Sequence, residues 1–169
     1  MEKRVYCSIF FMMMTFSLMA QLYDSAAGVR LGAPLALSYK KIINENKAVE
    51  GYLGTRKIGD ARFTNISGAY QIHQPIDLFN FEELYYYGFG ASIYFWSFEE
   101  EGSNQLVSPG LQGYLGLEYT FEDKPLNVTL DWIPSIFLSG PIGGLRGGFL
   151  AIGVRYVITR DGSGNLEDQ

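Results

Sequence analysis

The segment Gly110-Leu111-Gln112-Gly113-Tyr114-Leu115-Gly116-Leu117-Glu118-Tyr119-Thr120-Phe121 alternates between two kinds of side chain. Apart from one glycine, its odd-numbered positions are apolar, and they end in two aromatic residues. Its even-numbered positions are small or polar and include the carboxylate of Glu118. Because successive side chains of a strand point to opposite faces, this alternation predicts a β-strand with one apolar face and one polar face.

The same alternation recurs along the rest of the chain, and no segment after residue 20 shows a sustained helical period. The chain contains 20 glycines, 12 tyrosines and 12 phenylalanines among 169 residues, a composition that favours a closed sheet with one small-residue face. We therefore predict an all-β fold. The predicted strands cover residues 26–43, 48–56, 62–74, 85–96, 108–121, 126–136 and 147–158, with turns or loops at 43–47, 57–61, 75–84, 97–107, 122–125 and 137–146.

The number of strands depends on Pro34, which lies in the middle of the first segment and cannot donate a hydrogen bond to a neighbouring strand. One long strand with a bulge at Pro34 gives seven strands, and a hairpin that turns at Ala33-Pro34 gives eight. Bacterial single-chain membrane barrels have an even number of strands, with short turns on the periplasmic side and longer loops outside. If the short turn at 122–125 is periplasmic, the chain needs two strands before residue 48. Eight strands are therefore expected.

The distribution of side chains over the two faces separates two kinds of barrel. The apolar faces carry large aliphatic and aromatic residues, whereas the other faces carry glycine, alanine, serine and charged residues. A soluble barrel fills its interior with bulky apolar side chains or a ligand, whereas a transmembrane barrel turns them towards lipid. We predict a closed antiparallel transmembrane β-barrel of about eight strands. The alternative is a soluble periplasmic lipocalin-like barrel that binds an apolar ligand.

The N-terminus predicts export from the cytoplasm. A basic start at residues 1–4 precedes an uncharged apolar run that ends at the small residue Ala20, as in a cleaved signal peptide. An uncleaved anchor helix is the alternative. We expect residues 1–20 to be the signal peptide, 21–159 the barrel domain and 160–169 a disordered polar tail. Cys7, the single cysteine, falls in the signal, so no disulfide is expected.

The charge balance argues against nucleic acid as a partner. Loss of Glu2, Lys3 and Arg4 with the signal would lower the 13 basic and 18 acidic residues to 11 and 17. Binding to phosphates along a nucleic acid requires clusters of lysine and arginine, which an acidic chain does not supply.

Several segments resemble the small OmpA-like outer-membrane β-barrel proteins of Gram-negative bacteria. The resembling runs include Gly28-Val29-Arg30-Leu31-Gly32-Ala33-Pro34, residues 113–121 and Val154-Arg155-Tyr156-Val157. The resemblance implies an eight-stranded barrel in the outer membrane, in contact with membrane lipid and the barrel insertion machinery, and we expect a monomer. It implies no activity. Such barrels usually end on an aromatic residue, whereas here Tyr156 is followed by about a dozen more residues.

The candidate functional residues are charges on the polar faces. Glu118, Asp131 and Arg155 lie on three consecutive predicted strands, and closure of the barrel would bring Arg155 beside Arg30, with Glu50 nearby. Buried charges in a narrow lumen must pair. We therefore predict a structural charge network in the lumen, formed by these five residues. A small pore or proton path is the alternative, for which eight strands leave little room.

No catalytic, cofactor-binding or metal-binding residues are predicted. His73 is the single histidine; no nucleophile motif surrounds it, and we expect it to be satisfied at a membrane interface. The expected function is non-enzymatic, with a structural, adhesive or envelope-maintenance role. An outer-membrane lipid hydrolase is a third hypothesis.

Overall fold

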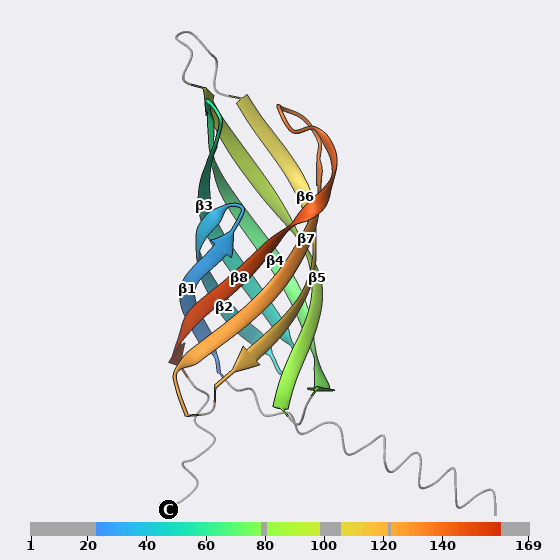
Figure 1. Ribbon diagram of the computed structural model, residues 1–169. Helices are drawn as coiled ribbons and strands as arrows, with labels where there is room; N and C mark the ends of the chain where they lie inside the picture. Colours follow the sequence, from blue (N-terminus) through green and yellow to red (C-terminus); the bar gives the residue numbers. More distant parts are fainter. Residues whose placement is uncertain (1–22, 79–80, 99–105, 122, 160–169) are drawn as a thin grey trace, which may run out of the picture.

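The computed structural model describes residues 23–78, 81–98, 106–121 and 123–159. These residues form eight antiparallel strands, each paired with its sequence neighbour, and β1 pairs with β8 to close the barrel (Figure 1). The predicted signal peptide at 1–20 and the predicted tail at 160–169 lie outside the described residues. The strands are β1 (Ser25–Gly32), β2 (Leu35–Asn44), β3 (Lys47–Ile58), β4 (Ala61–Leu78), β5 (Phe81–Phe98), β6 (Leu106–Thr120), β7 (Leu126–Phe137) and β8 (Gly144–Thr159).

The prediction of eight strands is confirmed, and the first alternating segment is a hairpin. β1 and β2 turn at residues 33–34 and pair with Val29 opposite Leu37. Closure then places Gly28 of β1 opposite Arg155 of β8. We call the end of the barrel with residues 23, 45–46 and 159 the base, and the end with the turns at 33–34 and 59–60 the rim.

The prediction of a loop at residues 75–84 is wrong, because β4 and β5 continue through most of it. Pro75 pairs with Leu84 in that extension. It lies beyond Ile72, which faces Lys47 at the start of β3. Past that point β4 has no pairing with β3, so the missing N–H of Pro75 costs no hydrogen bond on that side.

Other strands also run further than the alternation predicted, so the connections are shorter. Only Gly59 and Asp60 separate β3 from β4, and Gly59 has a φ of 58°, a conformation that suits glycine in a tight turn. β4 and β5 have 18 residues each, whereas β1 has 8. The wall is therefore uneven: the β1–β2 hairpin ends well below the tops of β4, β5 and β6 in Figure 1.

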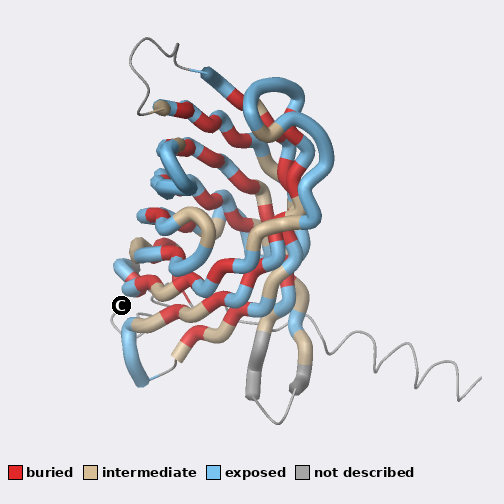
Figure 2. The backbone as a smooth tube through the Cα atoms, turned by 45° about the horizontal axis from the view of Figure 1, so that its top comes forward, coloured by how far each residue is buried: buried red, intermediate tan, exposed pale blue. Residues whose placement is uncertain are grey.

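Buried and exposed residues alternate along much of the barrel wall, as the colours of Figure 2 show, whereas residues 55–58 of β3 and 144–147 of β8 are all exposed. The large apolar residues are on the outside: Phe89 and Leu150 are each 67% exposed. Several charged residues are inside: Lys40 and Arg155 are 0% exposed. The strand quoted at the start follows the predicted orientation, with Leu111, Leu115 and Leu117 exposed and Gln112, Tyr114 and Glu118 buried.

Aromatic side chains fill the lumen near the rim. Phe63, Tyr94, Trp96 and Phe137 form one buried cluster, with the rings of Phe63 and Trp96 4.9 Å apart and those of Tyr94 and Phe137 5.0 Å apart. The indole N–H of Trp96 donates to Ser108 Oγ at 3.1 Å, which satisfies its polar group in this dry setting. These packed rings lie at the rim end of the lumen.

Gly116 offers a test of this packing from the inner wall. A Cβ at Gly116 would lie 2.4 Å from Cζ of Tyr86, whose ring is buried between neighbours in the lumen, whereas a Cβ at the outward Gly68 would meet nothing within 4 Å. We expect Gly116→Ala to lower the free energy of unfolding by about 1–3 kcal/mol through overpacking, and Gly68→Ala to lower it by less. Urea unfolding in detergent, followed by tryptophan fluorescence, measures both. Equal stability of the two variants would contradict the prediction.

Candidate functional site

Among the described residues, the buried Asp, Glu, Lys, Arg and His side chains of the lumen come from seven of the eight strands. Their inward direction follows from the alternation of each strand. Each is at most 5% exposed, so none is stabilised by bulk water. They are Arg30 on β1, Lys40 on β2, Glu50 on β3, His73 on β4, Glu118 on β6, Asp131 on β7 and Arg155 on β8.

The first group is centred on Glu50. Its Oε1 accepts hydrogen bonds from Arg30 Nη1 at 2.7 Å and from Arg155 Nη2 at 2.5 Å. Its Oε2 accepts from Gln71 Nε2 at 2.9 Å. Arg30 Nη2 also lies 2.6 Å from Asp131 Oδ2. We call these five residues the Glu50 cluster; two guanidinium groups balance two carboxylates in it, as a buried set of charges requires.

Arg155 is the best-satisfied cation of the Glu50 cluster. Its Nε donates to Ser38 Oγ at 2.8 Å, and its Nη1 lies 3.2 Å from both Asn127 Oδ1 and Thr129 Oγ1. Together with the bond to Glu50, all three of its nitrogens therefore have acceptors. Strands β2, β3, β7 and β8 meet at this one side chain.

The second group is centred on Glu118. Its Oε2 contacts Lys40 Nζ and lies 2.9 Å from His73 Nε2. Its Oε1 accepts from Tyr23 Oη at 2.5 Å and from Asn127 Nδ2 at 2.7 Å. We call these five residues the Glu118 cluster. Lys40 Nζ also lies 4.6 Å from the ring centroid of Tyr86, a cation–π contact.

Tyr23 closes the lumen at the base. It precedes β1, is 3% exposed, and packs with Ala26, Val157 and Ile42. Burial, and then the neighbouring carboxylate of Glu118, raise the pKa of the Tyr23 phenol well above its ordinary value. The phenol therefore stays protonated and serves as a donor to Glu118.

The structure brings four of the five predicted network residues together and separates the fifth. Arg30, Glu50, Asp131 and Arg155 are in the Glu50 cluster, whereas Glu118 is in the other. Asn127 links the two clusters, because its Oδ1 accepts from Arg155 and its Nδ2 donates to Glu118.

Sequence reasoning missed four participants, Tyr23, Lys40, Gln71 and Asn127, and misplaced His73. Lys40 lies on the same face as Ser38 two residues earlier, so its inward position could have been found from the alternation. Tyr23 lies before the alternating pattern, and no sequence signal marks it. His73 is in the lumen at 5% exposed, not at a membrane interface as expected.

A small cavity lies beside the Glu50 cluster. A cavity of about 10 Å³ is bounded by residues that include Arg30, Pro34, Tyr52 and Phe149. This is close to the smallest volume that holds one water molecule. Tyr52 and Tyr114 lie beside it, with their hydroxyls 2.8 Å apart. The charged groups of the two clusters thus contact each other and the tyrosines beside them.

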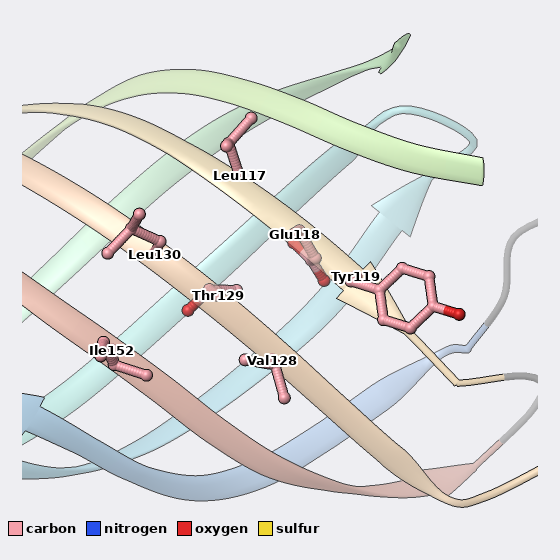
Figure 3. A pocket seen from close by; sticks show the side chains of 7 residues that line it. All are labelled: Leu117, Glu118, Tyr119, Val128, Thr129, Leu130 and Ile152. Atoms are coloured by element: carbon pink, nitrogen blue, oxygen red, sulfur yellow. The ribbon is translucent and has the colours of Figure 1, made fainter. Parts of the chain in front are cut away.

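A larger hollow, of about 290 Å³, lies on the outer wall of β6, β7 and β8 (Figure 3). The exposed side chains around it are apolar, including Leu117, Leu130 and Ile152. Glu118 and Thr129 border it through the wall, but both are buried on the lumen side. The hollow therefore presents an apolar surface without a group for acid, base or nucleophilic chemistry.

The described side chains provide no metal centre: no three His, Cys, Asp or Glu residues among them are grouped to hold an ion. Hydrogen bonds of the His73 side chain within this part of the chain go to Lys40 and Glu118, not to a serine. No helix in the described ranges is long and apolar enough to span a membrane.

The crystal structure of Neisserial surface protein A (NspA) is similar to this chain in fold. The TM-score is 0.58 and the sequence identity 18%, and the match covers 79% of this chain and 93% of NspA. No protein-family model and no curated protein sequence matches the chain. At this identity the likeness establishes the fold, an all-β closed barrel, and not the role.

Arg155→Ala tests the Glu50 cluster. The substitution leaves the buried Glu50 with one arginine instead of two, and we expect it to lower the free energy of unfolding by about 3–5 kcal/mol. Lys41→Ala, on an exposed position of β2, is the control and should have an effect near zero. Urea unfolding in detergent measures both.

A double variant, Glu50→Leu with Arg155→Met, separates the effect of the lost ion pair from the effect of the lost side-chain volume. It removes one charge of each sign and leaves Arg30 with Asp131, so we expect it to be more stable than Arg155→Ala alone. If Arg155→Ala proved as stable as Lys41→Ala, pairing in the lumen would not matter for the fold.

Proposed function

We propose that the chain is a non-enzymatic integral β-barrel protein of the outer membrane of a Gram-negative bacterium. One observation carries the proposal: the barrel is apolar outside and charged inside. Outward residues such as Leu37, Phe89 and Leu150 are 65–67% exposed, whereas Glu50 and Arg155 are at most 2% exposed. A water-soluble protein would gain stability by the opposite arrangement, and lipid is the solvent that suits this one.

The dimensions of β3 support a membrane crossing. Its outward residues run from Lys47 at the base to Lys57 near the rim, with Val49, Leu53 and Thr55 between them. Ten residue steps span about 34 Å along a strand, and a tilt of about 45° reduces this to about 25 Å along the membrane normal. That is the height of the apolar band of an outer-membrane barrel.

Aromatic side chains support the same placement. Exposed tyrosines gather on the outer wall towards the base, as an interfacial girdle would: Tyr39, Tyr85, Tyr87 and Tyr156 are 39–63% exposed. The tyrosine ring suits this boundary because its body is apolar and its hydroxyl is polar.

In this proposal the lumen network is structural. The Glu50 and Glu118 clusters fill the barrel and hold its strands in register, so the protein acts through its outer wall and rim. A structural, adhesive or envelope-maintenance role follows. The protein would be a monomer, delivered by the barrel insertion machinery and surrounded by outer-membrane lipid.

The two other hypotheses have less support. A soluble lipocalin-like barrel needs an apolar lumen that holds its ligand, whereas this lumen contains the buried charges of Arg30, Glu50 and Arg155. A lipid hydrolase needs an accessible nucleophile beside its histidine, whereas His73 is buried between Lys40 and Glu118.

Cell fractionation tests the location. We expect the protein in the outer-membrane fraction, resistant to alkaline washing and soluble only in detergent. The folded barrel should also migrate differently from the boiled chain on a denaturing gel, because a closed sheet resists detergent until it is heated. Recovery from the periplasm without detergent would refute the proposal and favour the lipocalin-like alternative.

Conductance tests the closed lumen. Tyr23 at the base, the two charge clusters and the aromatic cluster at the rim should block a continuous water path. We expect no steady single-channel current from the protein in a planar lipid bilayer, with a general porin in the same bilayer as the positive control. A steady ohmic current would instead support the pore hypothesis.

A further inference from the structure

Two nitrogen groups of the Glu118 cluster share one carboxylate oxygen. Lys40 Nζ and His73 Nε2 both contact Glu118 Oε2, and these two nitrogens are themselves 2.9 Å apart. The other ring nitrogen of His73, Nδ1, is buried and has no hydrogen-bond partner in the described part of the chain. Neither a lysine ammonium nor a protonated histidine accepts a hydrogen bond, so both groups depend on Glu118 as their acceptor.

The titratable and charged groups around His73 come from several sides of the lumen. Lys40 on β2 and Glu118 on β6 contact the ring, and the ring of Tyr86 on β5 lies 5.1 Å from it. Tyr23, which precedes β1, donates to the second oxygen of Glu118. Of these groups, Glu118 alone carries a negative charge, and it already faces the ammonium group of Lys40.

The position of His73 along the barrel axis brings it close to water. Its backbone N–H donates to the carbonyl oxygen of Asn46, in the turn between β2 and β3, at 2.7 Å. That turn belongs to the base, and the pairing of β4 with β3 ends at Ile72. The His73 side chain is 5% exposed, whereas that of Lys40 is fully buried. A proton from bulk water therefore reaches His73 from the base.

The surroundings of His73 suit a neutral ring and not a protonated one. A neutral ring with its hydrogen on Nε2 donates to Glu118 and leaves a lone pair on Nδ1. A second proton would bind Nδ1, which has no acceptor among the described residues, and would add a positive charge 2.9 Å from Lys40 Nζ. Glu118 would then face two cations instead of one. An unsatisfied buried donor and an unbalanced buried charge both destabilise this arrangement.

We propose that the base of the barrel is sensitive to acid, and that protonation of His73 opens it. The protonated ring gains an acceptor for Nδ1 by turning towards water at the base, and this movement breaks its contact with Glu118. Tyr23 is held by the same carboxylate and packs at the same end, so it leaves its buried position when the ring turns outwards. The Glu50 cluster contains no histidine and keeps its ion pairs, so the change is confined to the base.

The direction of the pH dependence follows from proton binding. A histidine in water has a pKa of about 6.5, so the open form takes up a proton below that pH, whereas the closed form keeps the neutral ring. Because the open form binds more protons, its population rises as the pH falls. Between about pH 7.5 and about pH 5.5, the ratio of open to closed barrels increases by up to about tenfold.

A thiol at position 157 measures this opening. Val157 is 4% exposed and lies in the same buried cluster as Tyr23, so Val157→Cys reacts with a water-soluble thiol reagent only in the open form. The protein, in detergent, also carries Cys7→Ser. Its labelling rate is divided by that of Lys41→Cys, an exposed position, which corrects for the pH dependence of the thiol itself. We expect the corrected rate to rise about tenfold between about pH 7.5 and about pH 5.5.

Two variants assign the opening to His73 and to the base. Glutamine keeps an N–H donor for Glu118 and does not titrate, so with His73→Gln the corrected rate should change by less than about twofold over the same pH range. Ser92→Cys places the thiol near the rim: Ser92 is 3% exposed and pairs with Gly110, whose partner on β7 is Phe137 of the aromatic cluster. Its labelling should stay slow at both pH values.

The titration of His73 can also be followed directly, because it is the single histidine of the chain. We expect its ring resonances in NMR spectra to report protonation over the pH range in which labelling of Val157→Cys rises. This measurement needs no substitution at His73. The inference is overturned by an equal rise with His73→Gln, by an equal rise at Ser92→Cys, or by a ring that binds its proton while labelling of Val157→Cys stays slow.

Discussion

A carboxylate inside a narrow barrel must find cations within the barrel, and this constraint governs the structure. Glu50 is 2% exposed and lies between the guanidinium groups of Arg30 and Arg155. The cost of removing these charges from water is offset only when the partners lie in hydrogen-bonding geometry. That geometry exists because β8 returns to pair with β1, which places two arginines from the ends of the sheet around an acid on β3.

The polar interior and the apolar outer surface therefore both follow from the alternation of side chains along each strand. Inward positions supply the two charge clusters, and outward positions supply a surface that is mostly apolar between the base and the rim. Asn127 connects the clusters through the oxygen and the nitrogen of its side-chain amide. Tyr23 lies at the base end of these clusters, and the aromatic cluster lies at their rim end.

Much of this could be predicted from the sequence, because alternation assigns each side chain to a face. It placed Leu117 outside and Glu118 inside, and the even strand count identified the turn at Ala33-Pro34 as a hairpin. The alternation could not show the height of each side chain along the barrel axis, since that height depends on the stagger between neighbouring strands. For that reason the alternation predicts one network that includes Glu118 and Arg155, whereas Glu118 lies in a separate cluster with Lys40 and His73. Pro75 predicts the start of a loop, because proline cannot donate a hydrogen bond to a strand on each side. The sequence does not show that β4 has no β3 neighbour at this level, since that depends on the assembled sheet.

The contact between Glu50 and Arg155 also affects how the barrel opens and closes. The two residues are 105 positions apart in sequence, and β8 is the last strand of the barrel. Arg30 and Glu50 can meet within the first three strands, but Arg155 joins them only when β8 reaches β1. The seam therefore closes as one cooperative event, and reopening it separates ion pairs that water cannot reach. We therefore expect the folded barrel to have a low rate of unfolding, in addition to its equilibrium stability.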